Sequence, residues 1–259
     1  MDQEKKLERF SNFSSSGIYK LASKGRGALT LENVGASFDT YVKEKKREKK
    51  LKRAINSKAH TKAIIWGIVC ELYVFDRKLD TSFSNMNNVG RLSHTEIDNW
   101  TGIPDTFRKN ELVVGDIKCP SSLIKFCDLV ENTKLGIEEF KSNHADYYWQ
   151  LVSNAILTGV NKAELLFYVP YLSELDDIKD FVENLEESDL PIDLELHQIQ
   201  FIFHEINTYT QLGKIPISIP YLPNDSEYKD FNTFTFDIPK EDELFLNDRV
   251  KVAVQKLKG

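Results

Sequence analysis

The chain has 259 residues, a formal net charge of −6, 41% hydrophobic and 29% charged residues, which is an ordinary composition for a globular protein. This length suffices for one large domain. No apolar stretch approaches the roughly 20 residues of a membrane span, and the first residues lack the apolar core of a secretion signal, so we expect a cytoplasmic protein without a membrane segment. Three cysteines without a CxxC pair indicate a reducing compartment and argue against a zinc or iron–sulfur site.

Spacing of apolar residues, caps and turn residues predicts the elements of the first half of the chain. In chain order they are a serine-capped helix at 14–23, a glycine-punctuated loop at 21–35, a basic helix at 37–55, a buried helix at 61–79, a loop at 82–90, and strands at 91–107 and 111–120 around a turn at 108–110.

The second half follows a variable segment. Its predicted elements are an amphipathic helix at 144–159 ending at Gly159, a strand at 162–172, an acidic helix at 172–188, a strand at 194–206, loops with short strands at 207–238, and a closing helix at 239–258. This order indicates a mixed sheet flanked by helices.

Charge is unevenly distributed along the chain. Residues 1–62 hold 16 Lys and Arg against 7 Asp and Glu, and residues 43–53 alone hold eight against two, whereas residues 171–200 hold ten acids and one lysine. Such asymmetry can mark a nucleic-acid-binding face on an acidic protein. A solvated helix with Glu–Lys pairs explains the basic run equally well, so charge alone leaves both interpretations open.

Charged residues interrupt the most apolar strand of the chain, at 111–120. Asp116 and Lys118 are two positions apart and therefore share one face of the strand. Asp105 lies on the preceding strand, and the intervening turn allows its carboxylate to meet that of Asp116 at one end of the sheet. Because an unpaired buried ion is costly, these groups need solvent, each other or a metal ion.

A third carboxylate, Glu71, lies on the predicted buried helix, and the backbone carbonyl of Ile117 lies between the two side chains of the strand. Oxygen donors of this kind suit a hard cation such as Mg²⁺. A neighbouring lysine can position or help deprotonate a water, or hold a phosphate, which fits phosphodiester hydrolysis. Taken alone, the D-x-K tripeptide is explained more simply by an Asp–Lys salt bridge.

Four segments in order make a more specific pattern: WGIVCE (66–71), GIPD (102–105), GDIKCP (115–120) and the helix and strand at 147–170. The pattern resembles the signature of PD-(D/E)XK nucleases, and among them that of the lambda-exonuclease-like viral recombination nucleases, over about residues 7–172. The resemblance implies one restriction-endonuclease-like α/β domain over 1–259. Its mixed sheet would be flanked by helices. Residues at about 187–238 exceed what the compact relatives carry and are expected to form a β-rich elaboration before the closing helix at 239–258.

The resemblance also implies residue roles. Glu71, Asp105, Asp116 and the Ile117 carbonyl would hold Mg²⁺, with Mn²⁺ as a substitute. Lys118 would orient or activate the attacking water. In the family, a glutamine on the following helix supports the lysine or contacts substrate, and Gln150 matches it.

The expected activity is 5′-to-3′ exonuclease digestion of linear duplex DNA, in a bacterial cell and a phage or prophage context. A single-strand annealing protein is the implied partner, and a homo-oligomer is the implied assembly. Arg9 and Ser16 match an arginine and a serine that hold a terminal 5′ phosphate, although Ser16 also fits a plain helix cap. The basic helix is expected to bind DNA through Lys45, Lys46, Lys49 and Lys50.

Three positions depart from the family pattern. The acid before the lysine is Asp116 where relatives more often carry Glu, Val152 replaces a second glutamine, and Ile103 replaces a serine, which weakens the 5′-phosphate inference. A site-specific or nicking endonuclease on the same fold, or a catalytically silent DNA-binding module, therefore remain alternatives.

Overall fold

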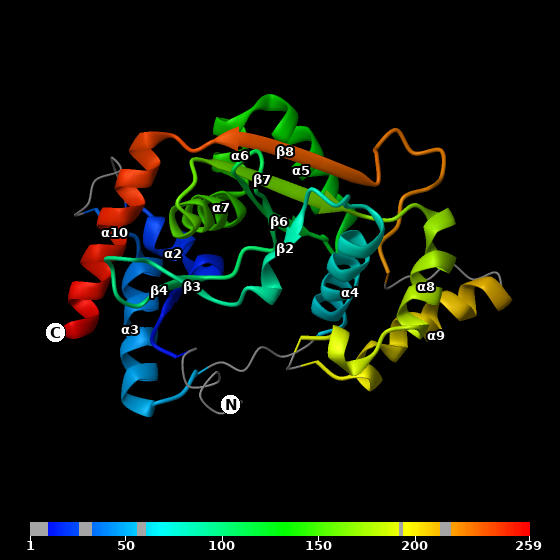
Figure 1. Ribbon diagram of the computed structural model, residues 1–259, viewed down its shortest axis with the longest axis horizontal. Coiled ribbons are helices and arrows are strands. Elements are labelled where there is room, and N and C mark those ends of the chain that lie inside the picture. The colour runs from blue at the N-terminus through cyan, green and yellow to red at the C-terminus, as the bar shows by residue number, and fades with distance from the viewer. Residues whose placement is uncertain (1–9, 26–32, 56–60, 192–193, 213–218) are drawn as a thin grey trace.

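The computed structural model describes residues 10–25, 33–55, 61–191, 194–212 and 219–259. Figure 1 shows a sheet across the upper part of the molecule, with helices above it, beneath it and at both ends. None of the helices in these described ranges is both long enough and apolar enough to cross a membrane.

The strands form two sheets. The larger, mixed sheet has the order β2-β5-β6-β7-β8, with parallel pairing only between β6 and β7. Its strands are β2 (Ser84–Asn85), β5 (Thr106–Arg108), β6 (Val113–Lys118), β7 (Lys162–Tyr168) and β8 (Phe231–Asp237). The small sheet has the order β1-β4-β3 and contains β1 (Phe13–Ser14), β3 (Leu92–Ser93) and β4 (Trp100–Gly102). Strand β6 is therefore central, which gives its residues partners on both sides.

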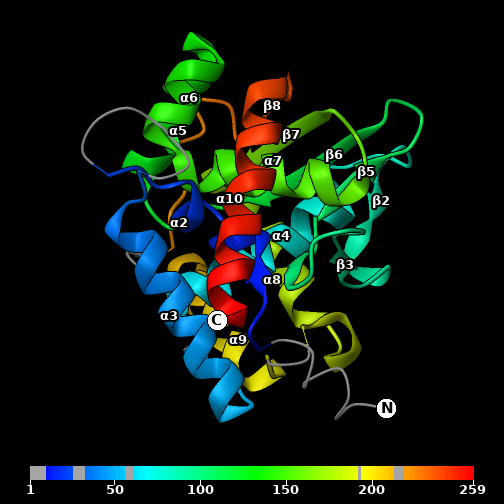
Figure 2. The ribbon, with the colours of Figure 1, turned by 90° about the vertical axis from the view of Figure 1, so that its left-hand side faces the viewer.

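The helices are distributed along the whole chain. The α-helices are α2 (Tyr19–Ala22), α3 (Ala36–Leu51), α4 (Lys62–Arg77), α5 (Leu123–Leu135), α6 (Ile137–Asn143), α7 (Ala145–Thr158), α8 (Leu175–Glu183), α9 (Leu196–Leu212) and α10 (Lys240–Lys258). The 3₁₀ helices are η1 (Ser15–Gly17), η2 (Met86–Asn88), η3 (Leu172–Glu174) and η4 (Glu187–Asp189). Helix α10 packs against α2, α3 and α7, which closes that end of the molecule (Figure 2).

Two hydrophobic cores lie on opposite faces of the larger sheet. Because side chains alternate along a strand, β7 sends Leu165 and Phe167 into the first core and Leu166 and Tyr168 into the second. The first core also contains residues of α2, α3, α5, α7 and α10, and the second contains residues of α4, α8 and α9. The sheet is thus covered by helices on both faces, as the predicted fold class requires.

Most elements with strong sequence signals are confirmed. The predicted helices at 61–79, 144–159 and 239–258 correspond to α4, α7 and α10. Thr61 caps α4 by accepting a hydrogen bond from the Ile64 N–H at 3.4 Å, and Gly159 ends α7 in the left-handed conformation at φ 72°. The expected serine-capped helix at 14–23 is instead η1 followed by the short α2, and Ser14 makes no side-chain capping bond.

The predicted strand at 194–206 is wrong, because this segment lies in helix α9. Its letters alternate locally, but the fully buried residues are Ile199, Ile202 and Ile206, whose spacing of three and four is helical. The elaboration at 187–238 therefore contributes α9 and the edge strand β8. The variable segment before α7 forms α5 and α6, which were not predicted.

Candidate active site

The candidate site is built on strand β6. The two faces of this strand are covered by different helices. Asp116 and Lys118 lie on the same face as Val114, which belongs to the first core, whereas Ile117 belongs to the second. Strand β6 is locked in register by β5 on one side and β7 on the other, with Asp116 opposite Leu165. Gly115 allows this close approach, because a Cβ there would lie 2.1 Å from the buried Thr106 hydroxyl.

Three side chains meet around the Asp116 carboxylate. Its side chain is only 1% exposed, and its Oδ2 forms an ion pair with the Lys118 ammonium. Its Oδ1 accepts a hydrogen bond of 2.8 Å from the amide Nε2 of Gln150, which projects from α7. The structure therefore brings together Asp116, Lys118 and Gln150, as the sequence predicted. Gln150 contacts the Asp116 carboxylate.

Asp105 completes this group from the neighbouring strand. It lies immediately before β5, and its Oδ2 accepts a hydrogen bond of 2.7 Å from the backbone N–H of Ile117. Its own N–H donates to the Gly115 carbonyl at 3.1 Å, which extends the β5–β6 pairing by one residue. The two aspartates thus meet at the end of the sheet where sequence spacing placed them.

The charged groups of the site act strongly on one another. Burial, together with the negative charges of Asp116 and Glu71, raises the pKa of Asp105 well above its usual range, against the opposing effects of Lys118 and the Ile117 N–H. Burial lowers the pKa of Lys118, but the charges of Asp116 and Asp105 outweigh burial, so this pKa lies above that of an ordinary lysine. Lys118 is therefore an ammonium at neutral pH, suited to donate hydrogen bonds rather than to accept a proton.

Glu71 lies on α4, the helix that packs against β6 from the side of the second core. It is half-buried, and its charge acts on both Asp105 and Lys118. Across the ranges that the structure describes, no three His, Cys, Asp or Glu side chains are grouped so as to hold a metal ion. The negative charges of Asp116 and Glu71 both act on Asp105, and that of Asp116 acts more strongly.

The donor chemistry of Asp105 and Asp116 fits a hard divalent cation. Both ligand candidates are carboxylates, and their mutual repulsion contributes to the raised pKa of Asp105. The buried Oδ2 atom of Asp116 is paired with the Lys118 ammonium, so this one lysine faces the negative charges of both aspartates. A bound cation would neutralise this excess negative charge.

One contact in the site was missed by sequence reasoning. Tyr147 and Tyr148 both lie on α7, and Tyr148 is fully buried with its hydroxyl donating to Asp242. The ring of Tyr147 lies under the Lys118 ammonium, with 5.5 Å between Nζ and the ring centroid. The spacing in the sequence could have predicted this contact, because Tyr147 precedes Gln150 by three residues and therefore lies on the same face of the helix.

Helix η1 lies beside the strand that leads to Asp105. The hydroxyls of Ser15 and Ser153 are 2.8 Å apart, and the indole N–H of Trp100 donates to Ser153 at 2.9 Å. This buried network joins η1, β4 and α7. Ser16 is exposed, and its hydroxyl lies 3.2 Å from that of Ser14. Arg9 lies outside the described residues.

Gly102→Ala is expected to destabilise the fold by about 1–3 kcal/mol, a typical cost of overpacking. An added Cβ would lie 2.1 Å from the Ser15 hydroxyl and 2.8 Å from Leu157 Cδ1, so η1 would have to move. Denaturant unfolding of the purified variant measures this change. Gly67→Ala is the matched control, because its Cβ would meet only the Cys119 carbonyl, at 3.7 Å, and alanine favours the helix. Equal stability of the two variants would contradict the packing argument.

The basic helix forms as predicted, but Lys45 differs from the expected exposure. Phe38, Tyr41, Val42, Lys45 and Glu48 form the buried face of α3. Lys45 is only 8% exposed, and its ammonium donates to Glu48 Oε2 at 2.9 Å. Lys49 and Lys50 are exposed, and Lys46 is half-buried. Burial thus removes Lys45 from the surface that the helix offers to a ligand.

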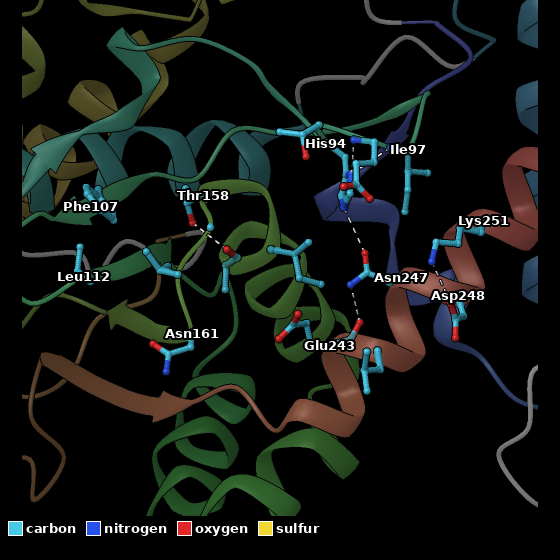
Figure 3. A pocket seen from close by; sticks show the side chains of 17 residues that line it. His94, Ile97, Phe107, Leu112, Thr158, Asn161, Glu243, Asn247, Asp248 and Lys251 are labelled. Atoms are coloured by element: carbon cyan, nitrogen blue, oxygen red, sulfur yellow. Dashed lines mark hydrogen bonds and ion pairs between the residues drawn. The ribbon is translucent and has the colours of Figure 1, made fainter.

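A surface cavity of about 740 Å³ lies apart from these residues (Figure 3). It is lined by the end of α7, by α10 and by the segment around His94, and none of the site residues lines it. His94 stacks on Trp100 with ring centroids 4.9 Å apart, and its Nε2 lies 3.2 Å from Asn247 Oδ1. These contacts give His94 a structural role.

Three solved structures of exonucleases are similar to this chain in fold. LHK-Exo in complex with dAMP aligns with a TM-score of 0.59 and 14% identity, over 99% of this chain and 92% of that one. The alkaline exonuclease LHK-Exo from Laribacter hongkongensis aligns at 0.56 and 13%, over 99% and 92%. A phage-related exonuclease from Haemophilus somnus 129PT aligns at 0.52 and 12%, over 95% and 93%. No family model and no curated protein matches the chain. The motif-based resemblance is thus confirmed at the level of the fold.

Proposed function

We propose that the chain is a metal-dependent nuclease that digests linear duplex DNA from a 5′ end. The observation that carries this proposal is the meeting of Asp105, Asp116, Lys118 and Gln150 at the end of β6. Two carboxylates beside a lysine whose pKa is raised suit a phosphodiester, whose transition state gains negative charge. The exonuclease fold of the neighbouring structures supports the same reaction class.

The residues of the chain divide the chemistry among them. Asp105 and Asp116 would hold Mg²⁺ or Mn²⁺, with Glu71 and the Ile117 carbonyl as further oxygen donors nearby. When bound, such a cation supplies a more acidic water and charge neutralisation at the phosphate. Lys118, as an ammonium, holds the attacking water or a phosphate oxygen by hydrogen bonds. Gln150 fixes the Asp116 carboxylate through Oδ1, so that the orientation of this ligand does not depend on the lysine.

Helix η1 is proposed to bind the DNA end. Ser16 offers an exposed hydroxyl there, and the packing of Ser15 against Gly102 holds η1 beside the strand that leads to Asp105. Arg9 would add a charge-assisted contact to a 5′ phosphate. A ring-shaped homo-oligomer and an annealing partner are proposed from the family resemblance, and light scattering of the purified protein tests the former.

Digestion of three substrates in Mg²⁺ tests the activity: linear duplex with a 5′ phosphate, linear duplex with a 5′ hydroxyl, and covalently closed circles. We expect the phosphorylated linear duplex to be degraded fastest and the circles to stay intact. Nicked circles would instead identify an endonuclease on this fold. Equal residual cleavage by wild type and Asp116→Ala would show a contaminant, and the nuclease proposal would then be wrong.

Charge reversal on α3 is expected to weaken DNA binding. Replacing Lys46, Lys49 and Lys50 by Glu, with Lys45 left intact, should lower the affinity. It should also flatten the dependence of log Kd on log salt by about 0.9 per lost phosphate contact. Fluorescence anisotropy at several salt concentrations, in Ca²⁺ to suppress turnover, measures both quantities. The melting temperature should change little, because exposed charges contribute little to stability.

The matched control for α3 reverses three exposed lysines of α10, namely Lys240, Lys251 and Lys258. This control changes net charge by the same amount on a neighbouring helix. Equal loss of affinity in both variants would mean that net charge, and not the position of α3, governs binding. Unchanged affinity in the α3 variant would make the helix a solvated surface.

A further inference from the structure

We propose that Tyr147 is a positioning residue of the site, whose ring holds the Lys118 ammonium against Asp116; its effect on catalysis rests on the proposed function. The proposal begins from the geometry of Lys118, whose side chain is 21% exposed at the end of β6. Its Nζ pairs with Asp116 and lies 5.5 Å from the centroid of the Tyr147 ring. The ammonium is therefore held between a carboxylate and an aromatic face.

The ring supplies what Asp116 alone cannot. A lysine side chain has four rotatable bonds, and a single carboxylate restrains only the terminal nitrogen. An aromatic face attracts an ammonium and also excludes water from one side of it. Asp116 is itself held by Gln150, so Tyr147 and Gln150, one helical turn apart on α7, fix the two partners of the ion pair.

The Tyr147 ring is itself held in place by His144, the residue that precedes α7, and by the first core. The rings of Tyr147 and His144 are stacked, with centroids 6.2 Å apart and an angle of 6° between their planes. His144 Nε2 lies 3.0 Å from the amide nitrogen of Asn132 on α5, so the histidine is tied to a second helix. The Tyr147 side chain also packs against the first core. These contacts fix the ring, and a fixed ring can restrain the lysine.

Steady-state cleavage of linear duplex by Tyr147→Leu and Tyr147→Phe tests the positioning role. We expect Tyr147→Leu to lower kcat on the order of tenfold, the loss expected for a partly desolvated cation–π contact, with KM within about twofold. Tyr147→Phe should recover most of the lost rate, because it retains the ring. Tyr221→Leu, which removes another half-buried tyrosine, controls for general loss of packing.

Three outcomes would overturn the proposal. An unchanged kcat in folded Tyr147→Leu would remove the positioning role. A raised KM with unchanged kcat would make Tyr147 a DNA contact. Equal loss in the Phe and Leu variants would assign the effect to the hydroxyl. If Tyr147→Leu does not fold, Tyr147→Met offers a flexible side chain that adapts to irregular space without an aromatic face, and it carries the same expectations.

A second measurement is independent of catalysis. Acetylation by an N-hydroxysuccinimide ester, followed by peptide mass spectrometry, reports how accessible Lys118 is relative to the exposed Lys125. Removal of the ring should raise Lys118 labelling several-fold in Tyr147→Leu but not in Tyr147→Phe. Unchanged labelling would overturn the role of the ring, whether or not the wild-type protein cleaves DNA. Raised labelling without wild-type cleavage would support the contact and contradict only the nuclease proposal.

Discussion

Lys118→Ala is expected to lower DNA cleavage in Mg²⁺ by about 10²–10³-fold, the range for loss of one preorganised charge-stabilising group. The lysine is the cation that the fold itself places beside the two carboxylates, and its raised pKa keeps it charged at neutral pH. Initial rates on a linear duplex measure the loss. Lys125→Ala, an exposed lysine on α5, is the matched control and should cleave like the wild type.

Folding must be separated from chemistry in this test. Loss of Lys118 leaves the buried Asp116 carboxylate without its counter-charge, so the single variant should be less stable than the wild type. The double variant Asp116→Asn, Lys118→Met removes both charges and should recover stability while remaining inactive. Circular dichroism and thermal melting establish that each variant is folded. Cleavage at the wild-type rate by folded Lys118→Ala would remove the lysine from the mechanism.

Asp105→Asn is expected to abolish cleavage and yet to raise the melting temperature of the metal-free protein at pH 8. Because the pKa of Asp105 is raised in the folded state, the folded protein binds this proton more tightly than the unfolded chain. Stability therefore falls as pH rises from the ordinary value of 3.8 through the raised folded pKa, and the penalty persists above it. Asparagine cannot ionise, so it avoids the penalty.

The pH dependence of this difference is the diagnostic measurement. In EDTA, the stabilisation by Asp105→Asn should shrink as pH falls and should vanish below about pH 4, where both states of the aspartate are protonated. Asp98→Asn is a control of opposite sign, because its hydrogen bond and ion pair with Lys258 lower the pKa of Asp98. Mg²⁺ should stabilise the wild type more than Asp105→Asn. A variant less stable than the wild type at every pH would contradict the proposed repulsion between the carboxylates.

Sequence reasoning succeeded where one local signal decides the structure. The apolar run of β6 is flanked by a turn and by Pro120, so the positions of Asp116 and Lys118 on one face followed from a period of two. Helix α7 ends at Gly159 as the pattern predicted, whereas the place of Gln150 in the site was implied by the family resemblance. In both cases the element is long and strongly patterned, so tertiary contacts did not override it.

The sequence predictions failed where contacts between distant residues determine the structure, or where one segment fits both a helical and a strand period. The hydrogen bond from Ile117 to Asp105 depends on the register of two strands, which no local pattern specifies. Lys45 was expected on the surface because it belongs to a basic run, although Phe38, Tyr41 and Lys45 share the spacing of one helix face. In α9, alternation of apolar letters was given more weight than the spacing of Ile199, Ile202 and Ile206.

Helices α3 and α8 carry exposed charges of opposite sign at two separate places in the molecule. Exposed lysines of α3 lie at one end, and Asp176 and Asp180 of α8, each about two-thirds exposed, lie towards the other (Figure 1). A polyanion at a distance exerts a torque on such a molecule, which turns the α3 end towards it before any contact forms. Productive encounters would then be selected during diffusion, and their frequency would fall steeply as added ions shorten the screening length.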